Sequence, residues 1–376
     1  MSDLQAEGSV VFPKEPLKSD NKKFDASLSQ TEDLILPSKE KLLEFLNIDD
    51  RFHNIDLITQ IIQSGIGLIN DHADRGELKM LNSCFKEMRY SLKVFLKYQD
   101  TKKISIFGSA RTPESNPSYL LTKKFSKLMS QLGYMIITGA ASGIMKAGHE
   151  GAGRKMSFGV NIRLPFEQKA NWIIKNDPKL ITYKYFFVRK LFFMKESYAI
   201  VLFPGGFGTL DEGYEALTLM QTGKARLLPI VMIAPPGNTY WHDWLSFVKK
   251  HMLRKELIHQ SDLSFFKITS SVAEARDEIL RFYRVYHSMR FVGTRLVIRT
   301  NVEVSDSLIQ EISEEFEDII DSGQIQKGKA LREEYNEKDI VHLPRLIFYF
   351  DRRSYGRLRQ MINKLNNAQA KNKKSK

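Results

Sequence analysis

The chain has 376 residues, of which 57 are Lys or Arg and 44 are Asp or Glu, so its formal net charge is +13. Its single cysteine, Cys84, excludes an intrachain disulfide and any zinc or iron–sulfur site built from cysteines. No apolar run reaches the roughly 18 residues that a membrane span needs, and residues 1–25 lack the apolar core of a secretory signal, so we expect a cytoplasmic protein without a membrane partner.

Much of the positive charge lies at the C-terminus. Residues 351–376 carry nine basic side chains and one acidic one, whereas residues 302–320 carry seven acidic and no basic ones. A basic tail binds nucleic acid by releasing counterions, but no aromatic platform or nucleic-acid motif accompanies this one. We therefore expect a solvated terminal helix and tail, and any nucleic-acid binding would rest on this segment alone.

Changes in composition and hydrophobic periodicity along the chain predict five segments. Residues 1–32 are polar and lack periodicity, as in a disordered leader. Residues 33–99 repeat apolar residues at three- and four-residue spacing, which predicts a helical preface. Short apolar runs alternate with helical stretches over 100–290, a smaller α/β alternation forms an appendage at 291–366, and a basic tail fills 367–376.

The region 100–290 predicts a Rossmann-like α/β fold. Five apolar runs are the expected strands: residues 104–107, 134–138, 157–164, 198–203 and 227–233. Helical patterns lie between them at 117–132, 143–154, 183–196 and 209–222. Strands that are apolar throughout indicate a parallel sheet with helices on both faces. In the appendage we expect two strands, in TRLVIRT and VHLPRLIFYF, and two helices, at 305–321 and 354–366.

The segment PGGFGTLDE (204–212), between a buried strand and a helix, is the strongest chemical signal. Three glycines let backbone N–H groups approach an oxyanion closely: Gly205, Gly206 and Gly208. The helix expected to begin near Thr209 adds the positive end of its dipole, so a phosphate is the expected guest. Thr209 and Glu212 also fit a capping box, in which both side chains satisfy backbone N–H groups, and spacing alone leaves both interpretations open.

Two further glycine turns follow predicted strands. Gly108 and Ser109 belong to the first, and Gly139 and Gly143 to the second. Three turns at the same edge of a parallel sheet favour a nucleotide-sized ligand. The chain lacks the dinucleotide fingerprint and the P-loop pattern, so neither NAD binding nor NTP hydrolysis is favoured. The eight histidines form no H-x-x-x-H pair, and we expect no catalytic metal.

Arg189 and Lys190 lie in a strongly apolar helix just before the strand that leads into PGGFGTLDE. The arginine can extend along the helix surface to solvent, or it can face the phosphate or base of a ligand. Composition alone leaves both interpretations open.

An Arg-Lys helix followed by PGGxGTxxE resembles the LOG (Lonely Guy) family of nucleoside 5′-monophosphate phosphoribohydrolases, formerly labelled possible lysine decarboxylases. The resemblance covers about residues 100–285, with support from GSAR, TGAASGIM, GVNIRLPFEQ and EALTLMQTGK. Residues 291–366 also look like the extension of longer bacterial members. The resemblance implies cleavage of the N-glycosidic bond of AMP or of a cytokinin ribotide, with no cofactor or metal.

By position, the resemblance implies that Arg189 and Glu212 are the catalytic pair. Glycosidic cleavage passes through an oxocarbenium-like state that a carboxylate can stabilise. The glycines of PGGFGTLDE and Thr209 would cradle the phosphate. Three further residues would line the ligand site: Lys190, Asp211 and Thr218. The resemblance also implies a homodimer with sites near the subunit interface.

Four positions depart from the family pattern: Ala140, Ala141, Lys146 and Phe193. Methyl groups at the second glycine turn restrict the approach of the backbone to a ligand. A non-catalytic carrier of a nucleotide or of molybdenum cofactor is the alternative function, because a fold does not fix a function. Lysine decarboxylation is disfavoured, because nothing in the sequence outlines a pyridoxal-phosphate site.

Overall fold

The computed structural model describes residues 38–46, 54–164 and 169–372. The predicted leader at 1–32 and the last four residues of the basic tail lie outside these ranges. The chain divides into two compact units, residues 1–82 and 83–376. Among the described residues, no helix is long and apolar enough to cross a membrane.

The smaller unit is helical, as its sequence pattern predicts. Its described residues form two helices and the first part of a third: α1 (Lys39–Leu46), α2 (Ile55–Asn70) and α3 (Arg75–Leu96). The remainder of α3 belongs to the larger unit, where it packs on the sheet through Val94 and Phe95.

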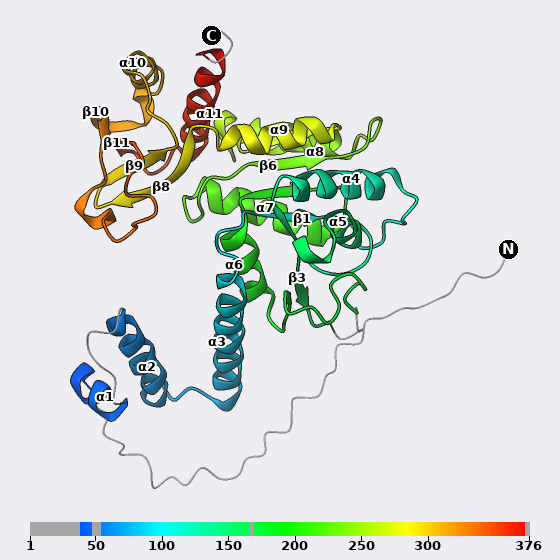
Figure 1. Ribbon diagram of the computed structural model, residues 1–376, viewed down its shortest axis with the longest axis vertical. Helices are drawn as coiled ribbons and strands as arrows, with labels where there is room; N and C mark the ends of the chain where they lie inside the picture. Colours follow the sequence, from blue (N-terminus) through cyan, green and yellow to red (C-terminus); the bar gives the residue numbers. More distant parts are fainter. Residues whose placement is uncertain (1–37, 47–53, 165–168, 373–376) are drawn as a thin grey trace, which may run out of the picture. The chain divides into compact units, whose positions relative to one another are not determined.

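The larger unit contains a seven-stranded parallel sheet with the order β4-β3-β2-β1-β5-β6-β7 (Figure 1). Its strands are β1 (Lys103–Phe107), β2 (Met135–Thr138), β3 (Ser157–Ile162), β4 (Leu180–Tyr183), β5 (Ala199–Leu202), β6 (Ile230–Ile233) and β7 (Phe266–Thr269). The Rossmann-like prediction is therefore confirmed. The two edge strands, β4 and β7, escaped prediction because they are short and only partly buried.

Alternate residues of the central strands face two separate apolar clusters. In β5, Ala199 and Val201 join one cluster and Ile200 and Leu202 join the other. Helices on one face cover the first cluster: α4 (Pro117–Gln131), α5 (Ile144–Ala152) and α9 (Val272–Phe282). The opposite face carries the end of α3 together with α6 (Phe186–Glu196), α7 (Phe207–Gln221) and α8 (Tyr240–Val248). This burial on both faces explains why the central strands are mostly apolar.

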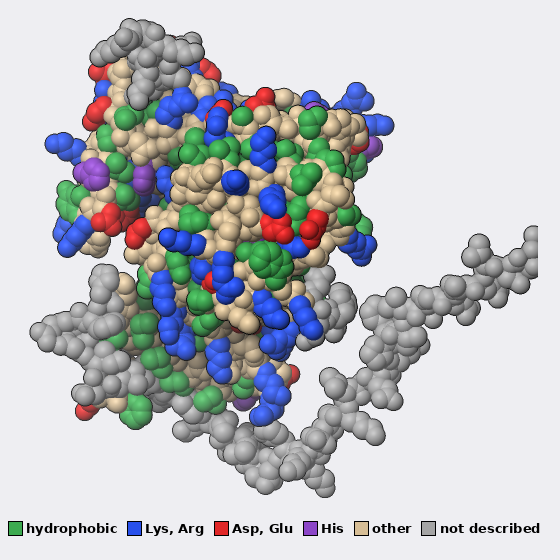
Figure 2. Space-filling view, turned by 45° about the vertical axis from the view of Figure 1, so that its right-hand side comes forward, with side chains coloured by type: hydrophobic (Ala, Val, Ile, Leu, Met, Phe, Trp, Pro, Cys, Tyr) green, Lys and Arg blue, Asp and Glu red, His purple; other side chains and the backbone are tan. Residues whose placement is uncertain are grey.

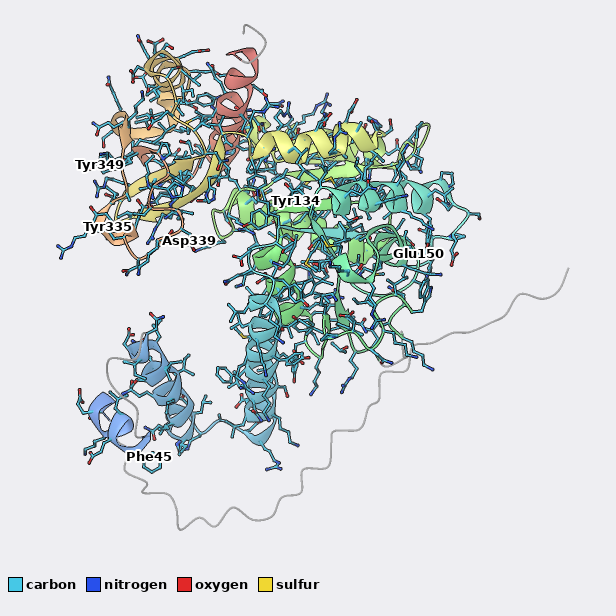
Figure 3. The ribbon with its side chains drawn as sticks, viewed as in Figure 1. Phe45, Tyr134, Glu150, Tyr335, Asp339 and Tyr349 are labelled. Carbon is cyan, nitrogen blue, oxygen red and sulfur yellow. The ribbon has the colours of Figure 1, made fainter. Side chains whose placement is uncertain are left out.

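The appendage contains a four-stranded antiparallel sheet with the order β10-β11-β9-β8. Its strands are β8 (Tyr286–Val292), β9 (Arg295–Thr300), β10 (Ile320–Gly328) and β11 (Arg345–Phe350). On β11 the exposed Tyr349, labelled in Figure 3, alternates with the buried Phe348 and Phe350. The sequence predicts β9 and β11 but not β8 and β10, whose residues are mostly half-exposed or polar.

The basic helix α11 (Tyr355–Asn372) is not the solvated helix that its charge suggests. Its apolar side chains enter the core of the larger unit: Leu358, Met361, Ile362 and Leu365. The buried Arg359 pairs with Glu278 of α9 at 3.0 Å. On its outer side, Lys364 pairs with Glu311 and Glu315 of the acidic helix α10 (Asp306–Glu315). That expectation is therefore wrong, because the helix is amphipathic and its partners are distant in sequence.

On one face of the molecule the positive charge is dispersed. On the face shown in Figure 2, Lys and Arg side chains are scattered over the surface and interspersed with uncharged and acidic groups. The surface on this face therefore does not present one continuous basic patch of the kind that tracks a nucleic-acid backbone.

Candidate active site

A cleft of about 680 Å³ lies at the carboxyl ends of four neighbouring strands, β3, β2, β1 and β5. Eight of the residues predicted for the site line it: Gly108, Ser109, Gly139, Arg189, Gly206, Gly208, Thr209 and Glu212. Open α/β sheets bind ligands at this edge, because the turns after parallel strands converge there.

The other predicted residues lie behind the lining or away from it. Gly143 and Gly205 are packed so closely that an added Cβ would overlap the backbone of Ser109 and the side chain of Thr209, respectively. Lys190 and Asp211 form an ion pair at 2.9 Å beside the cleft. Thr218 instead lines a separate small cavity next to Tyr214 and Trp244.

Helix α7 begins earlier than its sequence pattern suggests. Gly206 is its N-cap and Phe207 its first residue, so the first-turn N–H groups at Phe207 and Gly208 have no carbonyl partner within the helix. The positive end of the helix dipole therefore faces the cleft. Gly205 fixes this turn in place, because its carbonyl oxygen accepts a hydrogen bond of 2.6 Å from the Tyr240 hydroxyl.

The capping-box interpretation does not describe this helix start. Thr209 is the third residue of α7, and its N–H donates to the Gly206 carbonyl at 3.0 Å. The Glu212 carboxylate lies on the next turn and pairs with two cationic side chains of α6. Glu212 is therefore available to a ligand rather than committed to the helix backbone.

Arg189 of α6 and Glu212 of α7 form a buried ion pair. The Arg189 Nη2 atom lies 2.9 Å from Glu212 Oε1, and Lys190 Nζ lies 3.4 Å from Oε2. The guanidinium of Arg189 also stacks on the rings of Phe186 and Phe193, at 4.9 and 5.6 Å from their centroids. Burial raises the pKa of the Glu212 carboxyl, and the charges of Arg189 and Lys190 oppose this shift without cancelling it.

Lys190 joins α6 to three acidic groups of α7. Besides Glu212 and Asp211, it pairs with Glu215 at 2.6 Å. Burial lowers the pKa of Lys190, but its hydrogen bonds to Glu215 and Asp211 outweigh that effect and leave the pKa raised. Lys190 is therefore a firmly protonated cation that holds the carboxylates in place.

The second glycine turn is held by a buried polar network. The Asn171 side-chain amide donates to the carbonyl oxygens of Ala140 and Ala141, at 2.9 and 3.1 Å. The Thr138 hydroxyl accepts from the Ala140 N–H at 3.0 Å and contacts His149. Burial lowers the pKa of His149 to about 4, so this ring is neutral at physiological pH.

The four departures from the family pattern have different environments. Ala140 has a left-handed backbone with φ 63°, and its methyl group lies near Gly159 of β3. Ala141 lines the cleft itself. Lys146 pairs with Glu114 and with Glu150, which Figure 3 labels on α5. Phe193 also lines the cleft, beneath the Arg189 guanidinium.

Sequence reasoning missed several residues that line the cleft. They are Arg111, Met145, Asn161, Leu164, Phe186 and Phe207. Asn161 carried a usable signal, because it is a polar residue near the carboxyl end of an otherwise apolar strand. The aromatic and aliphatic residues carried none, because their types also suit a core. Among the described residues, no group of three or more His, Cys, Asp or Glu side chains is placed to hold a metal ion.

Residues 138–279 match the model of a family described as possible lysine decarboxylase. This segment includes the Arg-Lys helix and PGGFGTLDE, so the match confirms the LOG-family resemblance over it. A comparison with curated proteins found no match.

Several solved structures are similar to part of this chain at low identity. The molybdenum cofactor binding protein from Rippkaea orientalis is 16% identical, with 47% of this chain and 94% of that chain covered and a TM-score of 0.33. The molybdenum cofactor carrier protein from Chlamydomonas reinhardtii is 19% identical, with 48% and 98% covered and a TM-score of 0.32. DNA processing protein A from Helicobacter pylori is 13% identical, with 49% and 83% covered and a TM-score of 0.32. Similarities of this size say nothing about function.

The left-handed backbone at Ala140 predicts a difference between two neighbouring substitutions. Ala140→Gly and Ala141→Gly each remove one buried methyl group, but only the first removes a Cβ from a left-handed residue. Because that conformation costs an alanine about 1 kcal/mol, Ala140→Gly is expected to be about 1 kcal/mol more stable than Ala141→Gly. Urea unfolding of both variants measures this; equal stabilities would contradict the assignment of strain to Ala140.

The packing of PGGFGTLDE predicts opposite outcomes for two of its glycines. Gly205→Ala is expected to lower the free energy of unfolding by about 1–3 kcal/mol, because its Cβ would overlap Thr209. Gly206→Ala places its Cβ in open space within the cleft, so the fold should keep its stability while affinity for ribose 5-phosphate falls. Thermal unfolding and calorimetric titration test this pair; undiminished ribose 5-phosphate binding by Gly206→Ala would argue against a phosphate site at α7.

Proposed function

We propose that the cleft hydrolyses the N-glycosidic bond of a purine nucleoside 5′-monophosphate, AMP-like or a cytokinin ribotide, and releases free base and ribose 5-phosphate. The observation that carries this proposal is the buried Arg189–Glu212 pair beside the first turn of α7. The family match over residues 138–279 supports a phosphoribohydrolase-like or nucleotide-binding role.

The length of the cleft suits a nucleoside monophosphate. Its lining extends from β5 to β3, which is three strand spacings of about 4.8 Å each. We assign the phosphate to the N–H groups at Gly206, Phe207 and Gly208, because a helix N-terminus favours an anion. The base then lies toward the ends of β2 and β3, and the ribose lies beside Glu212.

The proposed chemistry needs an ionised carboxylate close to the ribose. The bond between C1′ and the base nitrogen breaks, and its electron pair leaves with the base. The Glu212 carboxylate stabilises the positive charge that develops at C1′, as carboxylates do in glycoside hydrolysis. The oxygen of a water molecule bonds to C1′ and its proton passes to Glu212. Glu212 then gives that proton to the departing base, which restores the carboxylate. Arg189 keeps Glu212 charged and positioned in a buried setting.

The alternative is a non-catalytic nucleotide or molybdenum-cofactor binding protein. The methyl group of Ala141 in the cleft wall is the observation in its favour, because it narrows the space beside the second turn. We prefer the enzyme, because burying the Glu212 carboxylate to 6% exposure costs desolvation free energy that its ion pairs do not fully repay. A catalytic role accounts for this cost.

We also propose that the active form is a homodimer. Helix α6 places three large apolar side chains on the surface close to the cleft: Phe186, Phe187 and Leu191, which are 47–58% exposed. A second copy that covered this face would bury them and would close the site from one side.

Glu212→Gln tests the catalytic assignment. The amide retains the size of the side chain but cannot carry the charge, so base release from AMP is expected to fall by about 100-fold or more. Glu215→Gln is the matched control on the same helix, because Glu215 also binds Lys190 but does not line the cleft. Chromatography of free adenine measures both rates.

Two outcomes of that assay would refute the proposal. If Glu212→Gln releases adenine as fast as the wild type, Glu212 has no catalytic role. If the wild type binds nucleoside monophosphates tightly but releases no base from any of them, the protein is the non-catalytic carrier.

The raised pKa of Glu212 predicts the acid limb of the pH–rate profile. The carboxyl must be ionised to act, so kcat/KM is expected to fall below a pKa that lies above the usual carboxyl range. Lys190→Met removes a charge that favours the ionised form, so the limb should move to higher pH. Lys195→Met is the control, because Lys195 pairs with Glu196 at the far end of α6.

The substrate phosphate also titrates, but its effect on kcat/KM is the same for each variant and the wild type at a given pH. The ratio of the two rates is therefore free of it. An acid limb that stays in place in Lys190→Met would show that Glu212 is not the titrating group.

A further inference from the structure

Asn161 is a buried polar residue in the wall of the cleft, and its side chain has no hydrogen-bond partner in the described part of the chain. It is 9% exposed and lies next to the last residue of β3. Among the described residues, no side chain or backbone group forms a hydrogen bond with its amide. Asn171 provides the contrast, because it is equally buried but donates to two carbonyl oxygens.

The strand geometry places Asn161 on a defined side of the cleft. Phe158, Val160 and Ile162 enter the apolar cluster beneath α6, so Asn161 projects from the opposite face of β3. On that side the cleft is lined by Gly139 and Ala141 of the second turn and by Met145 of α5. An amide with a free donor and a free acceptor therefore adjoins a mostly apolar surface, at the far end of the cleft from the first turn of α7.

A flat ring with an adjacent donor and acceptor complements this arrangement. The 6-amino group of adenine donates and its N7 accepts, so a single Asn amide can bind both atoms at once. Guanine and hypoxanthine present O6 and N7, which are both acceptors, so the amide oxygen would face an acceptor without a hydrogen between them. A buried polar group left unpaired in this way weakens binding.

We propose that Asn161 selects 6-aminopurine nucleotides over 6-oxopurine nucleotides by a paired hydrogen bond to the 6-amino group and N7. This inference rests on the proposed function, because it assumes that a nucleoside monophosphate occupies the cleft with its phosphate at α7. It adds the residue that distinguishes one purine base from another. Neither the glycine turns nor the Arg189–Glu212 pair can make that distinction.

Calorimetric titration of the full chain tests the proposal with four probes: AMP, IMP, purine riboside 5′-monophosphate and ribose 5-phosphate. Every form titrated, including the one with Asn161 that is called wild type below, carries Glu212→Gln so that AMP is not consumed during the titration. The wild type is expected to bind AMP about 10- to 100-fold more tightly than IMP or the purine riboside, the range of one bidentate amide–base contact. Asn161→Leu, which keeps the volume but not the polar atoms, should lose that preference and retain the affinity for ribose 5-phosphate.

Two further variants separate recognition from folding. Asn363→Leu makes the same substitution on α11, where Asn363 lines a cavity beside α10 and not the cleft, so it should leave all four affinities unchanged. Asn161→Asp replaces the amide donor by an acceptor, so it should weaken AMP binding with little change in packing. Thermal unfolding identifies any variant that is not folded.

The outcomes distinguish this inference from the proposed function. Equal affinities of the wild type for AMP and IMP, or an unchanged AMP affinity in Asn161→Leu, would overturn the role of Asn161 even if adenine is released. Equal losses of AMP and ribose 5-phosphate binding would show a merely structural role and would also overturn it. An AMP preference that depends on Asn161 without any base release would support the inference and refute the enzyme.

Discussion

The burial of one carboxylate, that of Glu212, constrains the whole site. A buried charge is tolerated only when cations and hydrogen bonds surround it. Arg189 and Lys190 supply the cations from α6, so α6 and α7 must keep a fixed register on the same face of the sheet. Phe186 and Phe193 hold the guanidinium, and this fixes the aromatic wall of the cleft as well. The catalytic assignment and the packing of these helices are therefore two aspects of the same interaction.

The sequence predicted the features that depend on local pattern. Central strands buried on both faces are mostly apolar, and the PGGFGTLDE turn carries its glycines at fixed spacing, so both could be found without a structure. The edge strands β4 and β7 could not, because their partly exposed residues lack such a pattern. The capping-box interpretation of Glu212 depends on where α7 begins, which the packing of Gly205 against Thr209 and Tyr240 sets, and the catalytic role of Glu212 is a proposal. Thr218 lies nearly two helical turns beyond Glu212, and it lines a different cavity, which its position in the sequence motif did not indicate.

The structure gives the basic C-terminal segment a different role from the one that its charge suggested. A basic segment and an acidic segment were each visible in the sequence, yet nothing in either one indicated that they would meet. In the structure Lys364 lies between Glu311 and Glu315, and Arg357 pairs with Asp318. These pairs offset part of the basic charge of residues 351–376 within the protein itself. The anion that we propose for the cleft is a single phosphate, held by backbone N–H groups at the start of α7.

The position of α11 has a consequence for how the chain acquires its structure during synthesis. This helix is near the end of the sequence, yet its apolar side chains complete the core of the larger unit, and Asn366 bonds the backbone at Val285 and Tyr286. The parallel sheet thus emerges from the ribosome well before the helix that covers part of it. Until residue 366 is available, apolar surface beneath α11 stays open to solvent and to chaperones. The nascent chain must therefore pass through an incompletely packed state that lasts for the synthesis of the entire appendage.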